Sequence, residues 1–284
     1  MNIVFKSLAR RLVIFLIILA ACVACGSSDS EKAAEHYFAG TEFAAAGDWQ
    51  EAIAEFDESV RLDPDAVDPH TTRGAVYAEP GQFQKAIDDY NEAIRIGPET
   101  ADVYYNRAVA YGALENFDAS IDDYSWAIEL DPRNTDAFFN RGFIHSQQGR
   151  DQLAIDDSSN AITINPADVE AYINRGLAYR AEGDYDLAID DFDQAILFNP
   201  GDSATYVNQG ITYDNMAQPE QAIEDFTQAI VFNARNGLAY ANRALVLAFL
   251  RQEEAAREDA EQSIALGIDR ETPITTLELN LLHK

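Results

Sequence analysis

The feature that most constrains the fold of this chain is a 34-residue interval that recurs along most of its 284 residues. Prolines stand at this interval, and so does a small residue followed by isoleucine. The prolines are Pro64, Pro98, Pro132, Pro166 and Pro200, and the pairs run from Ala52-Ile53 to Ala222-Ile223. A chain with such a period stacks copies of one structural unit.

One copy, residues 167–200, contains two amphipathic helical patterns, from Tyr172 to Tyr179 and from Ala188 to Ile196. Gly183 lies between them and can turn the chain without a Cβ penalty. Pro200 ends the unit because proline cannot continue a helix. Each helix has an apolar face that one unit cannot bury, so the unit needs copies of itself on either side.

From about Ala33 to Ile268 the copies resemble the tetratricopeptide repeat (TPR) family. The family's spacing of aromatic, Gly, Tyr, Gly, Ala, aromatic, Ala and Pro is matched by Tyr172, Gly176, Tyr179, Gly183, Ala188, Phe192, Ala195 and Pro200. The resemblance implies an all-α, right-handed superhelical solenoid of about seven helix-turn-helix repeats plus a C-terminal capping helix. The repeats are assigned to residues 33–66, 67–100, 101–134, 135–168, 169–202, 203–236 and 237–268, the last degenerate, and the capping helix to residues 269–284.

Residues 1–21 have the character of a secretory signal peptide: a short basic segment is followed by an apolar run too short to span a membrane comfortably. The sequence before Cys22 resembles a bacterial lipoprotein box, which implies cleavage there, lipidation of Cys22 and a tether over residues 22–32. Cys25 is the alternative lipidation site, and an ordinary cleaved signal is the alternative interpretation. Lipidation would place the repeats at the cell envelope, anchored to a membrane, and at the outer membrane in a two-membrane bacterium.

The net charge of −29 disfavours nucleic acid and anionic lipid headgroups as partners. It favours basic partners or serves solubility alone. Cys22 and Cys25 are the only cysteines, so the repeats have no disulfide framework and no cysteine metal site. The four histidines lack metal-ligand spacing, and no phosphate-binding glycine loop is present. We therefore expect no catalytic site, no metal and no cofactor.

Repeat four departs most from the pattern. His145 replaces the first-helix Tyr, Ser158 replaces the second-helix aromatic, and Asp151 replaces the aromatic after the turn. We expect His145 and Ser158 to form a satisfied polar contact inside the stack, with looser packing and a hinge at this repeat. A hydrolytic set of these three residues is the alternative, but no oxyanion-hole or nucleophile-turn signal accompanies it.

An asparagine recurs two residues after the first-helix aromatic in repeats three to seven, at Asn106, Asn140, Asn174, Asn208 and Asn242. By resemblance to the family this position lines the concave groove, and the column is similar to the asparagine ladder of O-GlcNAc transferase, which holds extended peptides. An amide both donates and accepts hydrogen bonds, as peptide binding requires. The alternative is that these asparagines bond between neighbouring helices and only space the repeats.

The next residue is arginine in most repeats, where the family usually has leucine. These arginines are Arg73, Arg107, Arg141, Arg175 and Arg243, with Gln209 in repeat six. An acidic pair recurs at the same interval in the second helices, from Asp88-Asp89 onward. We expect each arginine to pair with one carboxylate as a structural ladder. The rival is that the arginines face the groove and bind a partner's carboxylates.

The sequence thus predicts a non-enzymatic scaffold or adaptor of the bacterial cell envelope that binds other proteins or extended peptides in the concave TPR groove. The lipid anchor would attach it to a membrane, and nucleic acid is not an expected partner. A different class is a structural envelope lipoprotein that associates with its own copies. A hydrolase is the third alternative.

Overall fold

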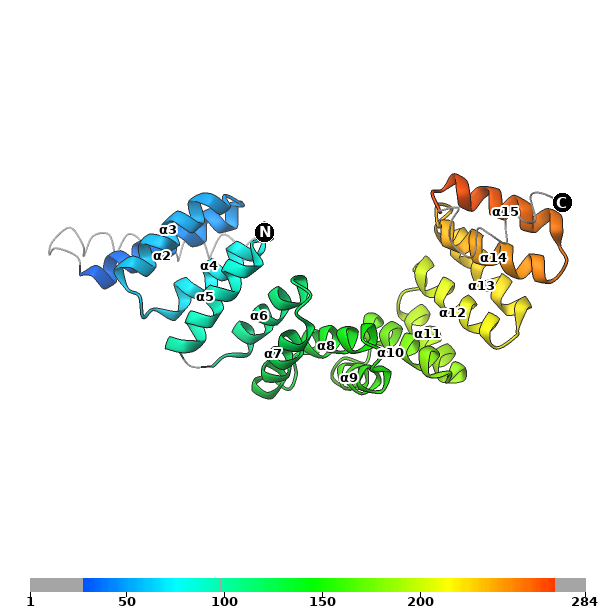
Figure 1. Ribbon diagram of the computed structural model, residues 1–284, viewed down its shortest axis with the longest axis horizontal. Coiled ribbons are helices and arrows are strands. Elements are labelled where there is room, and N and C mark those ends of the chain that lie inside the picture. Colours follow the sequence, from blue (N-terminus) through cyan, green and yellow to red (C-terminus); the bar gives the residue numbers. More distant parts are fainter. Residues whose placement is uncertain (1–27, 98, 269–284) are drawn as a thin grey trace, which may run out of the picture. The chain divides into compact units, whose positions relative to one another are not determined.

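The computed structural model describes residues 28–97 and 99–268, and in those residues the chain consists of fourteen α-helices and no strand. They divide into two units at Asp131 and Pro132, each a stack of antiparallel helix pairs (Figure 1). The first unit contains α2 (Asp29–Ala46), α3 (Trp49–Leu62), α4 (Val67–Ala78), α5 (Phe83–Ile96), α6 (Ala101–Ala113) and α7 (Phe117–Leu130). The second contains α8 (Thr135–Gln147), α9 (Asp151–Ile164), α10 (Val169–Glu182), α11 (Tyr185–Phe198), α12 (Ser203–Asn215), α13 (Pro219–Phe232), α14 (Gly237–Phe249) and α15 (Glu253–Ala265).

The turn inside each helix pair uses the same backbone conformation. Between the two helices of each repeat one residue has a left-handed φ, and these turn residues are spaced 34 apart in the sequence. Glycine holds this position at Gly47, Gly81, Gly149 and Gly183, whereas Glu115, Ala217 and Arg251 adopt it with φ of 58°, 55° and 63°. The turn therefore has a fixed geometry that tolerates residues other than glycine.

Within a pair, the two helices approach through a small residue that faces an aromatic ring. In repeat five a Cβ added to Gly176 would lie 2.8 Å from the ring of Phe192. The same arrangement joins Gly40 to Phe56, Gly74 to Tyr90 and Gly210 to Phe226. These rings are almost fully buried and form the centre of each repeat's core. The aromatic and glycine positions of the sequence pattern are thus the two sides of one contact.

The N-terminal boundary differs from the one expected from the sequence. Helix α2 begins at Asp29, so residues 29–32 are helical and not part of a tether. Ser28 Oγ accepts a hydrogen bond from the Glu31 amide at 3.3 Å, and the Ser28 amide donates to Glu31 Oε2 at 3.0 Å. This capping box satisfies two backbone donors at the helix start and fixes the boundary.

The predicted all-α solenoid of helix-turn-helix repeats is confirmed for the described residues, in which consecutive helices of each unit pack as TPR pairs. The signal peptide, Cys22, Cys25 and the capping helix predicted at residues 269–284 lie outside the described residues. Among the helices that are described, none has the length and apolar character needed to cross a membrane.

Candidate functional site

The five arginines of the column form one repeated contact. In each, Nε and Nη2 donate to the two carboxylate oxygens of the aspartate sixteen residues later, on the second helix of the same repeat. In repeat five the distances are 2.8 Å from Arg175 Nε and 2.7 Å from Arg175 Nη2 to the oxygens of Asp191. The other pairs are Arg73–Asp89, Arg107–Asp123, Arg141–Asp157 and Arg243–Asp259. The contact is bidentate and always uses the second residue of the acidic pair.

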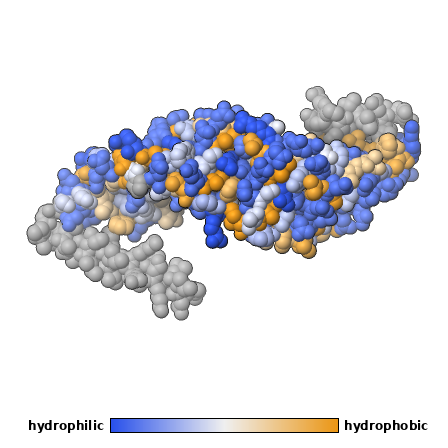
Figure 2. All heavy atoms as spheres, turned by 90° about the horizontal axis from the view of Figure 1, so that it is seen from below, coloured by the Kyte–Doolittle hydropathy of each residue, from blue (hydrophilic) through white to orange (hydrophobic). Residues whose placement is uncertain are grey.

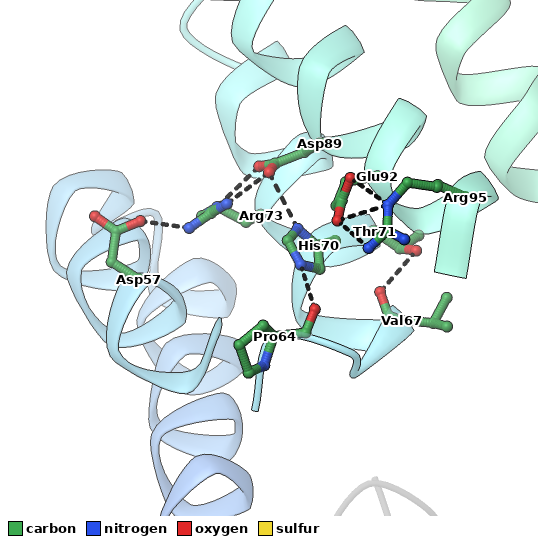
Figure 3. Close-up of polar contacts among 9 residues, drawn as sticks. All are labelled: Asp57, Pro64, Val67, His70, Thr71, Arg73, Asp89, Glu92 and Arg95. Atoms are coloured by element: carbon green, nitrogen blue, oxygen red, sulfur yellow. Dashed lines mark hydrogen bonds and ion pairs between the residues drawn. The ribbon is translucent and has the colours of Figure 1, made fainter. Parts of the chain in front are cut away.

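A third hydrogen bond links four of these arginines, Arg73, Arg107, Arg175 and Arg243, to the preceding repeat of the same unit. Arg73 Nη1 donates to Asp57 Oδ1 at 2.6 Å, so this guanidinium bridges Asp57 on α3 and Asp89 on α5 (Figure 3). The acceptor always lies sixteen residues before the arginine, and it is Asn91 for Arg107, Ser159 for Arg175 and Thr227 for Arg243. These acceptors were not identified from the sequence, although their fixed distance from the arginine could have revealed them.

Aromatic rings of the same helix flank the guanidinium groups. The carbon at the centre of the Arg175 guanidinium lies 5.7 Å from the ring centroid of Tyr172 and 5.9 Å from that of Tyr179. Arg107 has the same two neighbours, Tyr104 and Tyr111. Such contacts add cation–π attraction and keep the side chain in one orientation.

The electrostatics follow from this geometry. Hydrogen bonding with Asp191 raises the pKa of Arg175, against the opposing effect of burial. Burial works to raise the pKa of Asp89, but hydrogen bonds from Arg73 and His70 outweigh it and hold the pKa below its usual value. The arginine side chains are only 15–20% exposed, and all their donors described here face the protein's own acceptors. This arrangement leaves little capacity for a partner's carboxylates.

Repeat six breaks the ladder. Gln209 Nε2 donates to Asp193 Oδ1 of the preceding repeat at 2.6 Å, which reproduces the bond between repeats. The Gln209 amide does not donate to Asp225 Oδ2, on the residue sixteen positions later. As a result Asp225 Oδ2 is buried without a hydrogen-bond partner. Burial, with the charges of Glu224 and Asp193, raises the pKa of Asp225 to about 7.

The asparagine column lies one residue before the arginines on the first helices, and all five side chains are half-buried. Asn174 Nδ2 is buried without a hydrogen-bond partner, whereas Asn242 Nδ2 donates to Leu238 O of its own helix at 2.8 Å. Asn106, Asn140 and Asn208 occupy the equivalent positions on α6, α8 and α12. The asparagine amides therefore differ from repeat to repeat: Asn242 bonds within its own helix, and Asn174 Nδ2 has no partner.

An apolar residue follows each asparagine by three positions and shares its helix face. These residues are Val109, Phe143, Leu177, Ile211 and Leu245, of which Val109 and Phe143 are exposed and the rest half-buried. They were not identified from the sequence, although they recur at the same 34-residue interval. On the face drawn in Figure 2, apolar residues lie in small groups among polar ones.

The expected polar contact in repeat four is wrong. His145 and Ser158 are 6% and 1% exposed, but His145 Nδ1 and Ser158 Oγ have no hydrogen-bond partner. Burial lowers the pKa of His145. Asp151 makes no hydrogen bond with either residue, so the serine is not linked to a base as a hydrolytic set requires. The helices α9 and α10 are also in closer contact than other neighbouring repeats, which argues against looser packing on this side.

The described residues contain no group of three or more histidine, cysteine or acidic side chains that could hold a metal ion. The remaining described histidines have local partners. His36 Nδ1 lies 2.6 Å from Glu55 Oε2, and His70 contacts Asp89 and the carbonyl of Pro64.

Sequence profiles of the tetratricopeptide repeat match residues 101–134, 169–202 and 203–234, and a TPR repeat profile matches residues 40–81 and 76–115. Together they cover more than half of the chain. No curated protein matches the sequence.

Solved structures show the same fold. A tetratricopeptide repeat protein from Parabacteroides merdae is 20% identical, with a TM-score of 0.65 over 89% of this chain and 100% of that one. A MamA protein is 26% identical, with a TM-score of 0.58 over 60% of this chain and 93% of that one. YrrB, described as a TPR protein with an unusual peptide-binding site, is 23% identical, with a TM-score of 0.58 over 65% of this chain and 95% of that one. From its repeats, its helix pairs and these matches, the chain belongs to the tetratricopeptide repeat family.

Proposed function

We propose that this protein is a non-enzymatic interaction scaffold that binds extended segments of other proteins along the asparagine-bearing face of its first helices. The observation that carries the proposal is the unpaired amide of Asn174, set beside the apolar side chain of Leu177. The neighbouring Arg175 is occupied by the protein's own Asp191, so in repeat five the Asn174 amide is the polar group left to recognise a ligand.

The second unit offers the longest such face. Its first helices, α8, α10, α12 and α14, contact one another in order, so their asparagines and apolar residues form two neighbouring rows. An extended peptide exposes backbone donors and acceptors together with side chains, and the two rows suit these two features. Each amide hydrogen bond contributes about 1 kcal/mol net, so several in register are needed for useful affinity.

The charge of the protein indicates which peptides would be favoured. With a net charge of −29, the protein attracts basic segments and repels acidic ones over long range. Electrostatic attraction chiefly raises the association rate, so peptide binding should weaken as salt is added.

The test is a binding experiment on the chain without residues 1–25, using peptide arrays followed by fluorescence titration of the selected peptides. The variant Asn140→Ala/Asn174→Ala/Asn208→Ala removes one amide from each of three repeats. A matched control, Asn160→Ala/Gln194→Ala/Gln228→Ala, removes three exposed amides from the second helices of the same repeats, also 34 residues apart. We expect the first variant to lose about 100-fold in affinity, as three bonds of about 1 kcal/mol imply, and the control to bind as wild type does. Equal affinity of both variants would refute the proposed face.

We also propose that a lipid on Cys22 holds the protein at the bacterial cell envelope. The support is the apolar segment from Leu12 to Ala24, which contains Cys22, and the lipoprotein-type sequence before that cysteine. Labelled palmitate should be incorporated by wild type and by Cys25→Ser but not by Cys22→Ser. If labelling is lost only in Cys25→Ser, Cys25 is the lipidated residue. If wild type is not labelled, the proposal of a lipid anchor is refuted.

Self-association is a second candidate, favoured by two exposed apolar residues of α14 that lie on the same helix face as Asn242. Phe249 is 79% exposed, and Leu238 on the same helix is also exposed. A second copy that covered this face would remove both side chains from water. Light scattering should then show a concentration-dependent dimer that Phe249→Glu abolishes, whereas a monomer at all concentrations would exclude this candidate.

A further inference from the structure

The break in the arginine ladder at repeat six leaves a carboxylate in a place built for an ion pair. In the five intact repeats this aspartate accepts two hydrogen bonds from a guanidinium. Asp225 occupies the same position on α13, but Gln209 replaces the arginine and donates its hydrogen bond to Asp193. The aspartate is therefore present at its usual position in repeat six, whereas the guanidinium that neutralises it in the other repeats is absent.

The groups around Asp225 do not replace that cation. Glu224 on α13 and Asp193 on α11 are acidic and make its ionised form less favourable. On α12, burial raises the pKa values of Tyr206 and Tyr213, and the nearby negative charge of Asp225 adds to the effect.

The arginine of the next repeat already has its own hydrogen-bond partners. On α14, Arg243 donates to both oxygens of Asp259 and, through Nη1, to Thr227 Oγ1 at 2.9 Å. All three of those acceptors lie outside the Asp225 site. An ionised Asp225 is therefore held between like charges with one oxygen out of reach of water and of any donor.

We propose that the packing of α12 on α13 in repeat six is sensitive to pH. As the pH falls, Asp225 takes up a proton and this packing is stabilised. As the pH rises, Asp225 releases the proton and the packing of the two helices is weakened. In a repeat protein each repeat contacts only its neighbours, so such a change can stay local and alter the end of the stack that contains α12 to α15. The five intact repeats cannot respond in this way near neutral pH because their arginines keep the carboxylates paired.

The direction of the effect follows from linkage. Folding raises the pKa of Asp225 from its ordinary value of 3.8 to about 7, so the folded state binds the proton more tightly. The stabilisation from the protonated form is fully present below about pH 4 and is lost as the pH rises through about 7. The sensitive window therefore lies between these two values.

Two variants test this proposal. Asp225→Asn keeps the shape of the protonated side chain and cannot titrate, whereas Gln209→Arg restores the pattern of the other repeats. In wild type, the carboxyl carbon-13 signal of Asp225 should titrate near neutral pH, and Gln209→Arg should move that midpoint into the ordinary acidic range. A wild-type midpoint below pH 5 overturns the proposal.

Hydrogen exchange gives the structural readout. At pH 8.5, amides of residues 203–232 should exchange about tenfold faster in wild type than in Asp225→Asn, whereas at pH 5.5 the two should agree. Comparison at equal pH cancels the intrinsic effect of pH on exchange, and residues 169–198 of repeat five serve as the internal control. Equal exchange of the two proteins at both pH values overturns the proposal even if Gln209→Arg does not fold.

Discussion

At the scale of single residues, the arginine ladder has the strictest geometry, because each guanidinium donates to two carboxylate oxygens, and in four of the five it also donates to a third acceptor. We predict that Arg175→Ala lowers the free energy of unfolding by about 3 kcal/mol, since it leaves Asp191 charged, buried and unpaired. Urea denaturation monitored by circular dichroism measures the change.

The controls separate the ion pair from its burial. Arg175→Met/Asp191→Leu removes both charges and should recover much of the lost stability. Arg95→Ala removes an exposed arginine that pairs only with Glu92 three residues earlier, and it should leave the free energy of unfolding nearly unchanged. A loss at Arg175 no larger than that at Arg95 would show that the ladder is not structural.

The small residue that faces the aromatic ring gives a second matched pair. Gly176→Ala would place a Cβ 2.8 Å from the Phe192 ring and should destabilise the protein by about 1–3 kcal/mol. In repeat four the ring is absent, and the nearest atom to a Cβ on Gly142 is Asp157 Cβ at 3.1 Å. Gly142→Ala should therefore be nearly neutral, because the gain of about 1 kcal/mol in helix propensity offsets the tighter contact. Thermal unfolding of the two variants compares them, and equal losses would contradict this account.

The sequence was informative about these residues where the pattern repeats and misleading where it does not. The arginines and the acidic pairs were found because each recurs every 34 residues. The sequence did not show which member of each acidic pair binds the arginine, because that depends on how the two helices cross. The unusual residues of repeat four occur in that repeat alone, so no other repeat could be compared with it. His145 and Ser158 each had a plausible partner in sequence, yet the orientation of their polar atoms is decided by packing, and neither atom is satisfied.

At the scale of the helices, the turn of each pair sets a backbone requirement that three repeats meet without glycine. Ala217 has φ of 55°, a conformation in which a Cβ is unfavourable. We predict that Ala217→Gly raises the free energy of unfolding by about 0.5–1 kcal/mol, and that Gly183→Ala, with φ of 90°, lowers it by at least as much. Chemical denaturation of both variants measures the changes, and the same sign for the two would disprove the role of the turn.

Helix type and order could be predicted almost completely from the sequence, since a closing proline recurs in the first five repeats and apolar faces recur in all seven. The start of α2 could not be found by repetition, because the first repeat has no earlier copy to align with. Its signal was local, the Ser28 and Glu31 capping box. The shortened α4 was foreseeable, because Pro80 follows soon after its last residue, Ala78.

At the scale of the whole molecule, stability in a repeat protein is close to a sum over repeats and the interfaces between neighbours, so each of the two units can be considered by itself. The first contains three helix pairs and the second four, and about three repeats are enough to bury a continuous core. Each has its own fully buried residues, such as Tyr90 in the first unit and Phe226 in the second.

We therefore predict that residues 28–131 and residues 132–268 each fold when produced separately. Far-ultraviolet circular dichroism should show helical spectra that sum to that of the joined chain, and urea should unfold each fragment cooperatively. The fragment of residues 132–268 should be the more stable, because it has one more repeat and one more internal interface. If either fragment is unfolded while the whole chain is folded, the units depend on one another, and stability would then have to be assigned to the chain as a whole and not to its repeats.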